Sequence, residues 1–363
     1  MRTSRWVLSI LAVAVVGLAV VMWRASGGAG AGSFVIGGEL PPLLPDALGE
    51  WREVGRIPAD LLRSDGPVVA LEAVDGELFA LRYNHWYRLG RSGLMGPFGD
   101  ATRGSPNWIE RAVDLAWHDG RVYLLDGGRR QVSVWTDTGT RLHEIPLELN
   151  GTVPFEPEQI EVDALGRLYI VAHVASIYAP GDWMVLRVSD DGSSPDTLWR
   201  APSGATAGAG ANMPHISIRG DGNLLVATAL DYELHRIAEH GELLDIAVRR
   251  DPPAFEVPDS IRRQHEELLA RLPFSMREAY AMPDRIPPVR GVTLRADGSV
   301  VARVARTFET SYIEWLAPDG SPLGTISGEA IAEPIHVSEE SIFRAREAID
   351  VIVIETARLT LPD

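Results

Sequence analysis

The sequence predicts an all-β protein, a six-bladed β-propeller that carries a short helical insertion and a hydrophobic N-terminal helix. Short stretches rich in Val, Ile, Leu, Tyr and Trp alternate apolar with polar residues, which is the pattern of β-strands. Glycines in tight turns recur at intervals of 44, 46, 56 and 76 residues between Gly76 and Gly298, and such a period is typical of propeller blades. A β-sandwich is disfavoured because it does not repeat a four-stranded unit at this interval.

The composition indicates an ordinary globular protein that does not bind nucleic acid. Of its 363 residues, 45% are hydrophobic and 23% are charged, which is enough apolar surface for a large core. The formal net charge of -16 repels a phosphate backbone, and no run of Lys or Arg offsets it. The sequence has no cysteine, which excludes disulfides, thiolate metal sites and cysteine nucleophiles.

Residues 1–32 form an export segment followed by a Gly-rich linker. Arg2 and Arg5 precede the 18 uncharged residues 6–23, which are just long enough to cross a bilayer as a helix. Positive charge ahead of the span keeps the N-terminus in the cytoplasm and exports the remainder. We expect a signal anchor in the inner membrane, with the domain in the periplasm; cleavage after Ala31 would release the protein instead.

Beyond a single strand at residues 51–58, the chain repeats a unit of four strands and two tight turns. Glycine suits these turns because two-residue hairpins need positive φ angles. The first turn of each unit contains one glycine and the second turn another. The first set comprises Gly76, Gly120, Gly166, Gly222 and Gly298, and the second Gly93, Gly139, Gly192, Gly241 and Gly320.

The one long interval is explained by a helical insertion at about residues 258–283. Apolar residues share one helical face, Pro273 ends that helix, and Ser275 with Glu278 forms a capping box for a second short helix. The apolar face comprises Ile261, Leu268, Leu269 and Leu272. We expect the insertion to cover part of the loop face as a lid; the alternative is packing on the side of blade four or five.

The ends of the chain supply the sixth blade. Residues 335–361 read as about three strands with a turn that lacks glycine. A ring must close without exposed sheet edges, and the strand at residues 51–58 can complete the last blade. The propeller domain is therefore predicted to span residues 50–363.

Two repeat motifs carry a resemblance to known families. The sequences of Asp163 to Ile170 and of Asp114 to Asp126 resemble bacterial six-bladed propellers of the NHL-repeat and TolB-like type. The stretch from Pro283 to Val301, with the insertion before it, is similar to a largely uncharacterised group of exported propellers. The resemblance covers about residues 50–361 and implies the fold, but propellers host unrelated functions.

The loops between blades, and those between the second and third strands of each blade, should open on one face around the channel. Arg, His and aromatic residues gather in these loops, as they do in recognition surfaces. The predicted ligand-binding face comprises Arg82, His85, Trp86, Arg111, Arg129, His173, Trp183, His215, Tyr232, Arg290, Arg306 and Tyr312. With no recognisable catalytic set, this predicts a module that binds a protein, peptide or glycan and needs no cofactor.

The alternative is a metal-dependent hydrolase or lyase, because related six-bladed lactonases hold calcium at the channel mouth. His85, His173 and His215, with Asp114 and Glu161, could converge on a divalent cation near the axis. No local spacing of ligands supports this, and water-bridged polar lining of the channel is the simpler interpretation. Ser-His-Asp catalysis is disfavoured because the sequence has no Gly-x-Ser-x-Gly elbow.

Overall fold

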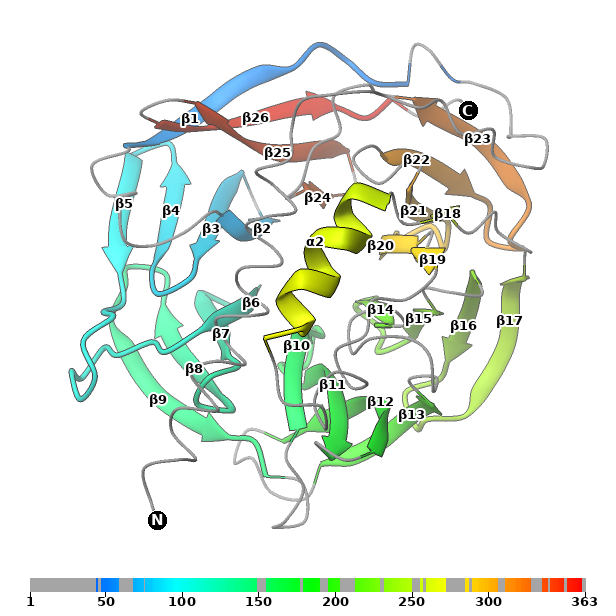
Figure 1. Ribbon diagram of the computed structural model, residues 1–363. Coiled ribbons are helices and arrows are strands. Elements are labelled where there is room, and N and C mark those ends of the chain that lie inside the picture. The colour runs from blue at the N-terminus through cyan, green and yellow to red at the C-terminus, as the bar shows by residue number, and fades with distance from the viewer. Residues whose placement is uncertain are drawn as a thin grey trace.

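Six four-stranded antiparallel sheets form a ring in the computed structural model (Figure 1). The structure describes residues 44, 47–58, 68–74, 76–148, 155–176, 179–189, 195–202, 213–228, 232–249, 255–256, 259–271, 285–286, 289–305, 311–327, 335–338, 340–348 and 351–360. The six-bladed propeller predicted from the sequence is thus confirmed. Each blade runs outwards from an innermost strand, and the order of strands in the sheet follows the order in the chain except in blade 6.

The first three blades follow one another along the chain. Blade 1 comprises β2 (Val68–Val74), β3 (Glu77–Arg82), β4 (Trp86–Gly90) and β5 (Gly93–Phe98). Blade 2 comprises β6 (Ala112–His118), β7 (Arg121–Asp126), β8 (Gln131–Thr136) and β9 (Arg141–Pro146). Blade 3 comprises β10 (Phe155–Val162), β11 (Leu168–Ser176), β12 (Ala179–Val188) and β13 (Asp196–Pro202).

The last three blades complete the ring. Blade 4 comprises β14 (His215–Ile218), β15 (Leu224–Thr228), β16 (Glu233–Ile237) and β17 (Leu243–Arg249). Blade 5 comprises β20 (Val289–Leu294), β21 (Val300–Ala305), β22 (Ser311–Leu316) and β23 (Pro322–Ser327). Blade 6 comprises β24 (Ile335–Val337), β25 (Ser341–Ala348), β26 (Val351–Arg358) and β1 (Arg52–Pro58).

The glycine turns lie where the repeat predicts them. Gly76, between β2 and β3, has a φ of 78°, and Gly298, between β20 and β21, has a φ of 84°. A side chain would be strained at such angles, so glycine is required. Gly192, predicted in the outer turn of blade 3, lies outside the described residues.

The ring closes through β1, as predicted. This strand pairs antiparallel with β26, in a register that sets Arg52 opposite Thr356 and Ile57 opposite Ile352. An isolated bridge between Leu48 and Leu359 extends the contact towards the N-terminus. Blade 6 therefore combines both ends of the propeller domain, and the outer edge of β26 is covered.

The core is divided into six apolar clusters, each between two neighbouring blades. Trp86 of blade 1, for example, is fully buried against Trp135 of blade 2, with ring centroids 6.2 Å apart. This division follows from alternation, because both faces of each sheet meet another sheet and strand residues of both parities are buried. Burial between blades holds the inner strands around the channel.

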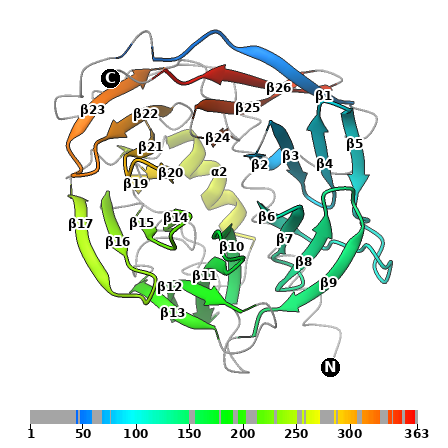
Figure 2. The same cartoon turned by 180° about the vertical axis from the view of Figure 1, so that it is seen from behind.

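A helix lies within the segment where the insertion is predicted. It is α2 (Asp259–Leu269), flanked by the paired strands β18 (Phe255–Glu256) and β19 (Arg285–Ile286). Figure 1 shows α2 across the centre of the ring, and in Figure 2 it is fainter because it lies on the far face. The predicted second helix lies outside the described residues.

Among the described residues, no helix is long and apolar enough to cross a membrane. The hydrophobic segment at residues 6–23 lies outside the described ranges, so the anchor stays a prediction.

Candidate functional site

The innermost strands line the channel, and their unpaired backbone edges are satisfied by side chains of the preceding blade. Asp114 on β6 accepts a hydrogen bond from the backbone N–H of Ile160 on β10, at 2.9 Å. Gln159 on β10 bonds both backbone groups of Ile216 on β14, at 2.9 and 3.1 Å. Such edge groups would otherwise be left without partners inside the protein.

The same arrangement continues around the ring. Ser217 on β14 accepts a hydrogen bond from the N–H of Leu294 on β20, at 2.9 Å. Thr293 on β20 donates a hydrogen bond to the carbonyl of Val337 on β24, at 3.3 Å. These inner-strand side chains therefore have a structural role, because each one joins neighbouring blades next to the axis.

At the junction of blades 6 and 1, an imidazole meets a carboxyl group. His336 Nδ1 on β24 lies 3.3 Å from Glu72 Oε2 on β2. Burial lowers the pKa of His336 to about 4, against the opposing effect of a hydrogen bond to the Leu71 backbone. Burial, followed by the charges of Glu161 and Asp114, raises the pKa of Glu72 well above its usual range. Although the distance fits a salt bridge, both pKa shifts favour the neutral form of the group concerned.

Four carboxyl groups, Glu72, Asp114, Glu158 and Glu161, form what we call the acidic wall of the channel. Burial raises the pKa of Asp114 to about 7, although backbone N–H groups oppose it. Burial also raises the pKa of Glu158 to about 7, although Arg111 opposes it. Burial and the charge of Asp114 raise the pKa of Glu161 to about 8. All four residues are half-buried.

The acidic wall occupies one side of the ring, on blades 1 to 3. Strand register identifies the equivalent positions, because Glu72 pairs with Phe79 and Glu161 with Tyr169, each three residues after the turn glycine. The same position holds Ala116 in blade 2, Ser217 in blade 4 and Thr293 in blade 5. Asp114 lies at a different register position of blade 2, opposite Leu125.

The described residues hold no group of three or more His, Asp and Glu side chains that could bind a metal ion. His173 is buried and its ring stacks on Trp183, with centroids 4.8 Å apart. No cation site emerges among the described residues from the predicted set of His85, His173, His215, Asp114 and Glu161. The metal hypothesis accordingly has no ligand set within the described parts of the chain.

Several residues of the predicted ligand-binding face belong to the core. Trp86 is 0% exposed, Trp183 2% and Tyr312 7%, and each packs between blades. Arg82, Tyr232 and His173 are likewise buried. Buried groups do not contact a ligand directly, so we revise their role to support of the loops. Half-buried positions are His85, Arg111, Arg129, His215 and Arg290, whereas Arg306 lies outside the described residues.

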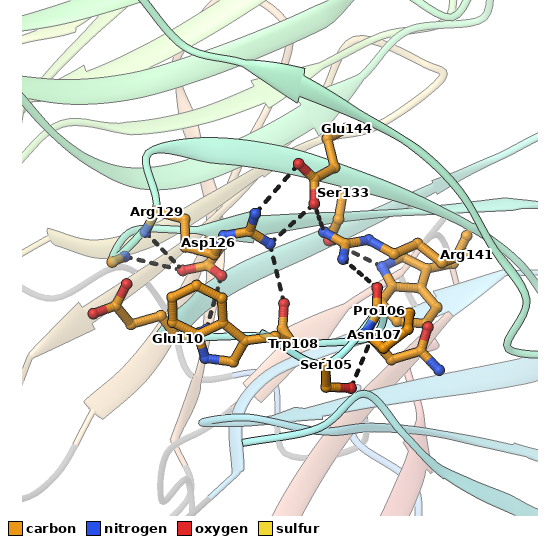
Figure 3. A network of polar contacts seen from close by, with 12 residues as sticks. Ser105, Pro106, Asn107, Trp108, Glu110, Asp126, Arg129, Ser133, Arg141 and Glu144 are labelled. Atoms are coloured by element: carbon orange, nitrogen blue, oxygen red, sulfur yellow. Dashed lines mark hydrogen bonds and ion pairs between the residues drawn. The ribbon is translucent and has the colours of Figure 1, made fainter. Parts of the chain in front are cut away.

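One residue of the loop face, Asp126, holds two loops together through hydrogen bonds (Figure 3). Its buried carboxylate accepts hydrogen bonds from four backbone N–H groups at 2.9 to 3.1 Å. The donors are Glu110, Arg111, Gly128 and Arg129. Asp126 therefore joins the loop before β6 to the loop between β7 and β8, and positions Arg111 and Arg129.

Helix α2 brings basic groups to the side of the helix that packs on the protein. Arg262, His265 and Leu269, spaced three and four residues apart, are half-buried, whereas Arg263 and Glu266 are exposed. Residues at this spacing share one helical face. Arg262, His265 and Leu269 therefore share the half-buried face of α2.

Comparisons of sequence find no relative: no protein-family model and no curated protein match the chain. Comparisons with solved structures find many matching chains. A candidate gluconolactonase matches with a TM-score of 0.50 and 16% identity, over 91% of this chain and 100% of that one. A gluconolactonase from Xanthomonas campestris gives a TM-score of 0.48, 15% identity and the same coverage. Virginiamycin B lyase from Staphylococcus aureus gives 0.47 and 15%, over 82% of each chain.

The fold and these comparisons define the structural class of the protein. The chain is a six-bladed β-propeller that resembles the candidate gluconolactonase in fold, and identity this low carries no chemistry across. Its particular character comes from its own residues, namely an acidic wall in a channel that α2 crosses.

Proposed function

We propose that this protein is a ligand-binding propeller of the cell envelope, exported and held at the inner membrane by residues 6–23 or released by cleavage. Its channel mouth recognises an amine or guanidinium group carried by a protein, peptide or glycan. The observation that supports this is the acidic wall, where Glu72, Glu158 and Glu161 are half-buried and have raised pKa values.

The physical reason is the cost of ionising neighbouring carboxyl groups inside protein. Burial penalises the charged form, and each charge penalises the next. A cationic group in the channel relieves both penalties, so its binding releases protons from the wall. For a lysine or arginine side chain, which stays charged over this range, affinity should therefore increase as the pH rises through about 7 to 8, where Asp114 and Glu161 ionise.

The test compares matched probes with the full-length protein in detergent. Calorimetry is run with a glucosamine hexamer and its N-acetylated form, and with a lysine-rich peptide and its acetylated form. We expect the amine forms to bind and the acetylated forms to lose at least about tenfold in affinity. Preference for the hexamer or the peptide distinguishes a glycan from a peptide ligand. Equal binding of amine and acetylated forms would overturn the proposal.

Two variants locate the binding. Glu161→Gln keeps the size of the side chain and removes its charge, and should weaken binding of the amine probes by about tenfold. Glu242→Gln removes an exposed charge on the β16–β17 turn and should leave binding unchanged. The same loss in both variants would show a non-specific effect of net charge.

A second function is favoured by one observation. Carboxyl groups with pKa values of about 7 to 8, as for Glu158 and Glu161, suit general acid and base catalysis near neutral pH. The alternative is therefore a hydrolase or lyase of the six-bladed lactonase type, with or without a divalent cation such as calcium. Turnover of a lactone panel, with and without added calcium, tests it. Activity that survives Glu158→Gln and Glu161→Gln would exclude these groups from the reaction.

A further inference from the structure

We propose that the ligand of the channel mouth carries a carboxylate as well as a cation, and that Arg111 binds this carboxylate. The ligand is a peptide that ends in lysine or arginine and has a free α-carboxylate. This inference rests on the proposed function, because the acidic wall binds the cation. Arg111 lies in the connection between β5 and β6, directly before the innermost strand of blade 2.

The backbone of Arg111 is fixed by the loops on both sides of it. Its N–H donates to Asp126 Oδ1 at 3.1 Å, and its carbonyl accepts a hydrogen bond from the N–H of Gly127 at 2.9 Å. The next N–H along the chain, of Ala112, donates to the carbonyl of Tyr83 in blade 1 at 2.8 Å. The Arg111 backbone is therefore held in place before any ligand arrives, which lowers the entropy lost on binding.

The guanidinium group of Arg111 lies against Gly127. A Cβ atom at residue 127 would lie 2.8 Å from Arg111 Nη2 and 3.2 Å from Cζ, so a larger residue there would displace the group. Arg111 is half-buried, yet among the described residues its guanidinium group makes no hydrogen bond and no ion pair. This planar group, which carries five N–H donors and stays charged, is thus available to an acceptor on a ligand.

Two other half-buried groups lie within the electrostatic influence of Arg111. Burial raises the pKa of Tyr83 and raises that of Glu158 to about 7, and the charge of Arg111 opposes both shifts. Arg111 and Glu158 do not form an ion pair, and within the described parts of the chain the Glu158 carboxyl group has no hydrogen bond. The two groups are therefore near each other but separate, and a ligand with both charges can bridge them.

A β-bulge at the start of β10 determines the position of Glu158. The register between β10 and β11 shifts at Glu158, which is the extra residue of the bulge. Such bulges redirect a side chain and are frequent beside functional sites. The inner strands β2, β6 and β20 have a bulge at the same place, which holds Val69, Val113 and Arg290. Of these four described bulges, that of blade 3 is the one that presents a carboxyl group.

Other carboxyl groups near Arg111 determine which kind of ligand fits. Asp126 accepts hydrogen bonds from four backbone N–H groups, and Asp114 accepts two at 2.9 Å each. Glu110 is exposed to solvent. Their negative charges offset the positive charge of Arg111 and disfavour a ligand that is purely anionic. A ligand that brings a cation together with its carboxylate avoids this repulsion.

A basic residue at the end of a peptide has both charges within one residue. A guanidinium group binds a carboxylate through two parallel hydrogen bonds, which fits the α-carboxylate to Arg111. The side-chain cation of the same residue then pairs with Glu158 in the acidic wall. A glucosamine chain has amines but no carboxylate, so the position of Arg111 favours a peptide among the ligands of the proposed function.

Calorimetry on the full-length protein in detergent tests the proposal with an N-acetylated pentapeptide that ends in lysine. The peptide is used as the free acid and as the C-terminal amide, which keeps the cation and removes the carboxylate. We expect the acid to bind about tenfold more tightly. Arg111→Gln should abolish this difference, whereas Arg91→Gln, an equal charge change at the exposed β4–β5 turn, should preserve it. Equal binding of acid and amide by the unaltered protein would overturn the proposal.

Two measurements separate ligand contact from folding. Because the Arg111 guanidinium group has no hydrogen bond among the described residues, Arg111→Gln should leave the midpoint of urea unfolding unchanged. A large fall of this midpoint would assign Arg111 to the fold and overturn the proposal. Gly127→Ala keeps every charge but displaces the guanidinium group, and should reduce the preference for the acid to less than about threefold. An unchanged preference in this variant would contradict the position assigned to the carboxylate.

The cation is tested separately, by acetylating the lysine side chain of the same free-acid peptide. If acetylation weakens binding while acid and amide remain equal, the proposed function holds and the inference about Arg111 fails. If acetylation has no effect while the acid still binds more tightly than the amide, the acidic wall does not bind the cation and the proposed function fails. Binding of none of these peptides would overturn the proposal that the ligand is a peptide with a basic C-terminus.

Discussion

Buried carboxyl groups in this propeller have two distinct environments. Asp163 accepts hydrogen bonds from the N–H groups of Leu165 and Arg167, each at 2.9 Å, and pairs with Arg167 Nε at 2.6 Å. These bonds hold the turn of the repeat motif. Glu161, on the neighbouring strand, has one long contact of 3.5 Å with Gln159 and a raised pKa. The first environment stabilises the fold, and the second leaves a group able to react or bind.

Asp126 should contribute strongly to stability. Removing its carboxylate in Asp126→Ala leaves four backbone N–H groups without their acceptor, which should lower the free energy of unfolding by about 3 kcal/mol or more. Asp126→Asn keeps the acceptor Oδ1, which serves three of the four, and should cost about half as much. Urea unfolding followed by fluorescence measures both. Equal losses would show that the four bonds do not carry the effect.

Glu161→Gln should stabilise the protein at pH 8 and have little effect at pH 4. Burial, with the charge of Asp114, raises the folded pKa of Glu161 from 4.5 to about 8. The folded protein holds a proton that the unfolded chain releases, so this contribution is present below about pH 4.5 and is lost as the pH rises through 8. The gain at pH 8 should be about 1 to 2 kcal/mol after allowance for water. Urea unfolding from pH 4 to 8 measures it, and parallel curves for the two proteins would contradict it.

For individual residues, the sequence predicted which types of side chain matter better than it predicted where each one lies. Asp114 and Glu161 were predicted near the axis, where they lie, but Glu72 and His336 were missed. A single acidic residue in the apolar strand VVALEAV was the available signal. Trp86 was predicted in a surface loop, yet β4 begins at Trp86 and turns it into the core. The alternation of apolar and polar residues along a strand cannot distinguish the two faces of a blade when both faces are buried.

At the level of secondary-structure elements, the repeated glycine turns and the need to cover the edges of the sheets predicted the fold. The spacing of glycines predicted five blades, and the need to cover the edge of the last sheet predicted that the N-terminal strand pairs with β26. The register could not be predicted, because it contains an irregularity between Glu53 and Gly55. A Cβ atom at Gly55 would lie 2.2 Å from Leu89 Cδ2, so β1 must approach this neighbour closely.

Closure by β1 leads to a matched pair of predictions. Ile57 is fully buried between blades 6 and 1, and Ile57→Ala should lower the free energy of unfolding by about 2 to 4 kcal/mol. Val54 on the same strand is 45% exposed, and Val54→Ala should change the free energy of unfolding by less than about 0.5 kcal/mol. Urea unfolding compares the two. Equal small effects would mean that β1 is not needed to hold the ring.

In the whole molecule, charged side chains are grouped unevenly, and the net charge of the chain does not reveal this. The chain has a net charge of -16, four half-buried carboxyl groups lie together on blades 1 to 3, and two guanidinium groups lie over the ring of Trp108. The sequence supplied the total and thereby excluded nucleic acid. The acidic wall could not be predicted in this way, since Glu72 and Glu161 are far apart in the chain and interact only after blades 1 and 3 are placed around one axis.

Salt should therefore stabilise the folded protein, and more strongly at high pH. Repulsion among like charges disfavours the compact state, and salt screens it within a Debye length of about 10 Å at 0.1 M. The channel carboxyl groups ionise through about pH 7 to 8, so repulsion is greater at pH 8.5 than at pH 5.5. Between 10 and 150 mM NaCl, we expect Tm to rise by a few degrees at pH 8.5 and less at pH 5.5, measured by calorimetry. Choline chloride should act like NaCl if screening alone is responsible, whereas a larger effect of NaCl would locate sodium in the channel. A Tm that falls with salt at pH 8.5 would contradict a destabilising repulsion among these carboxylates.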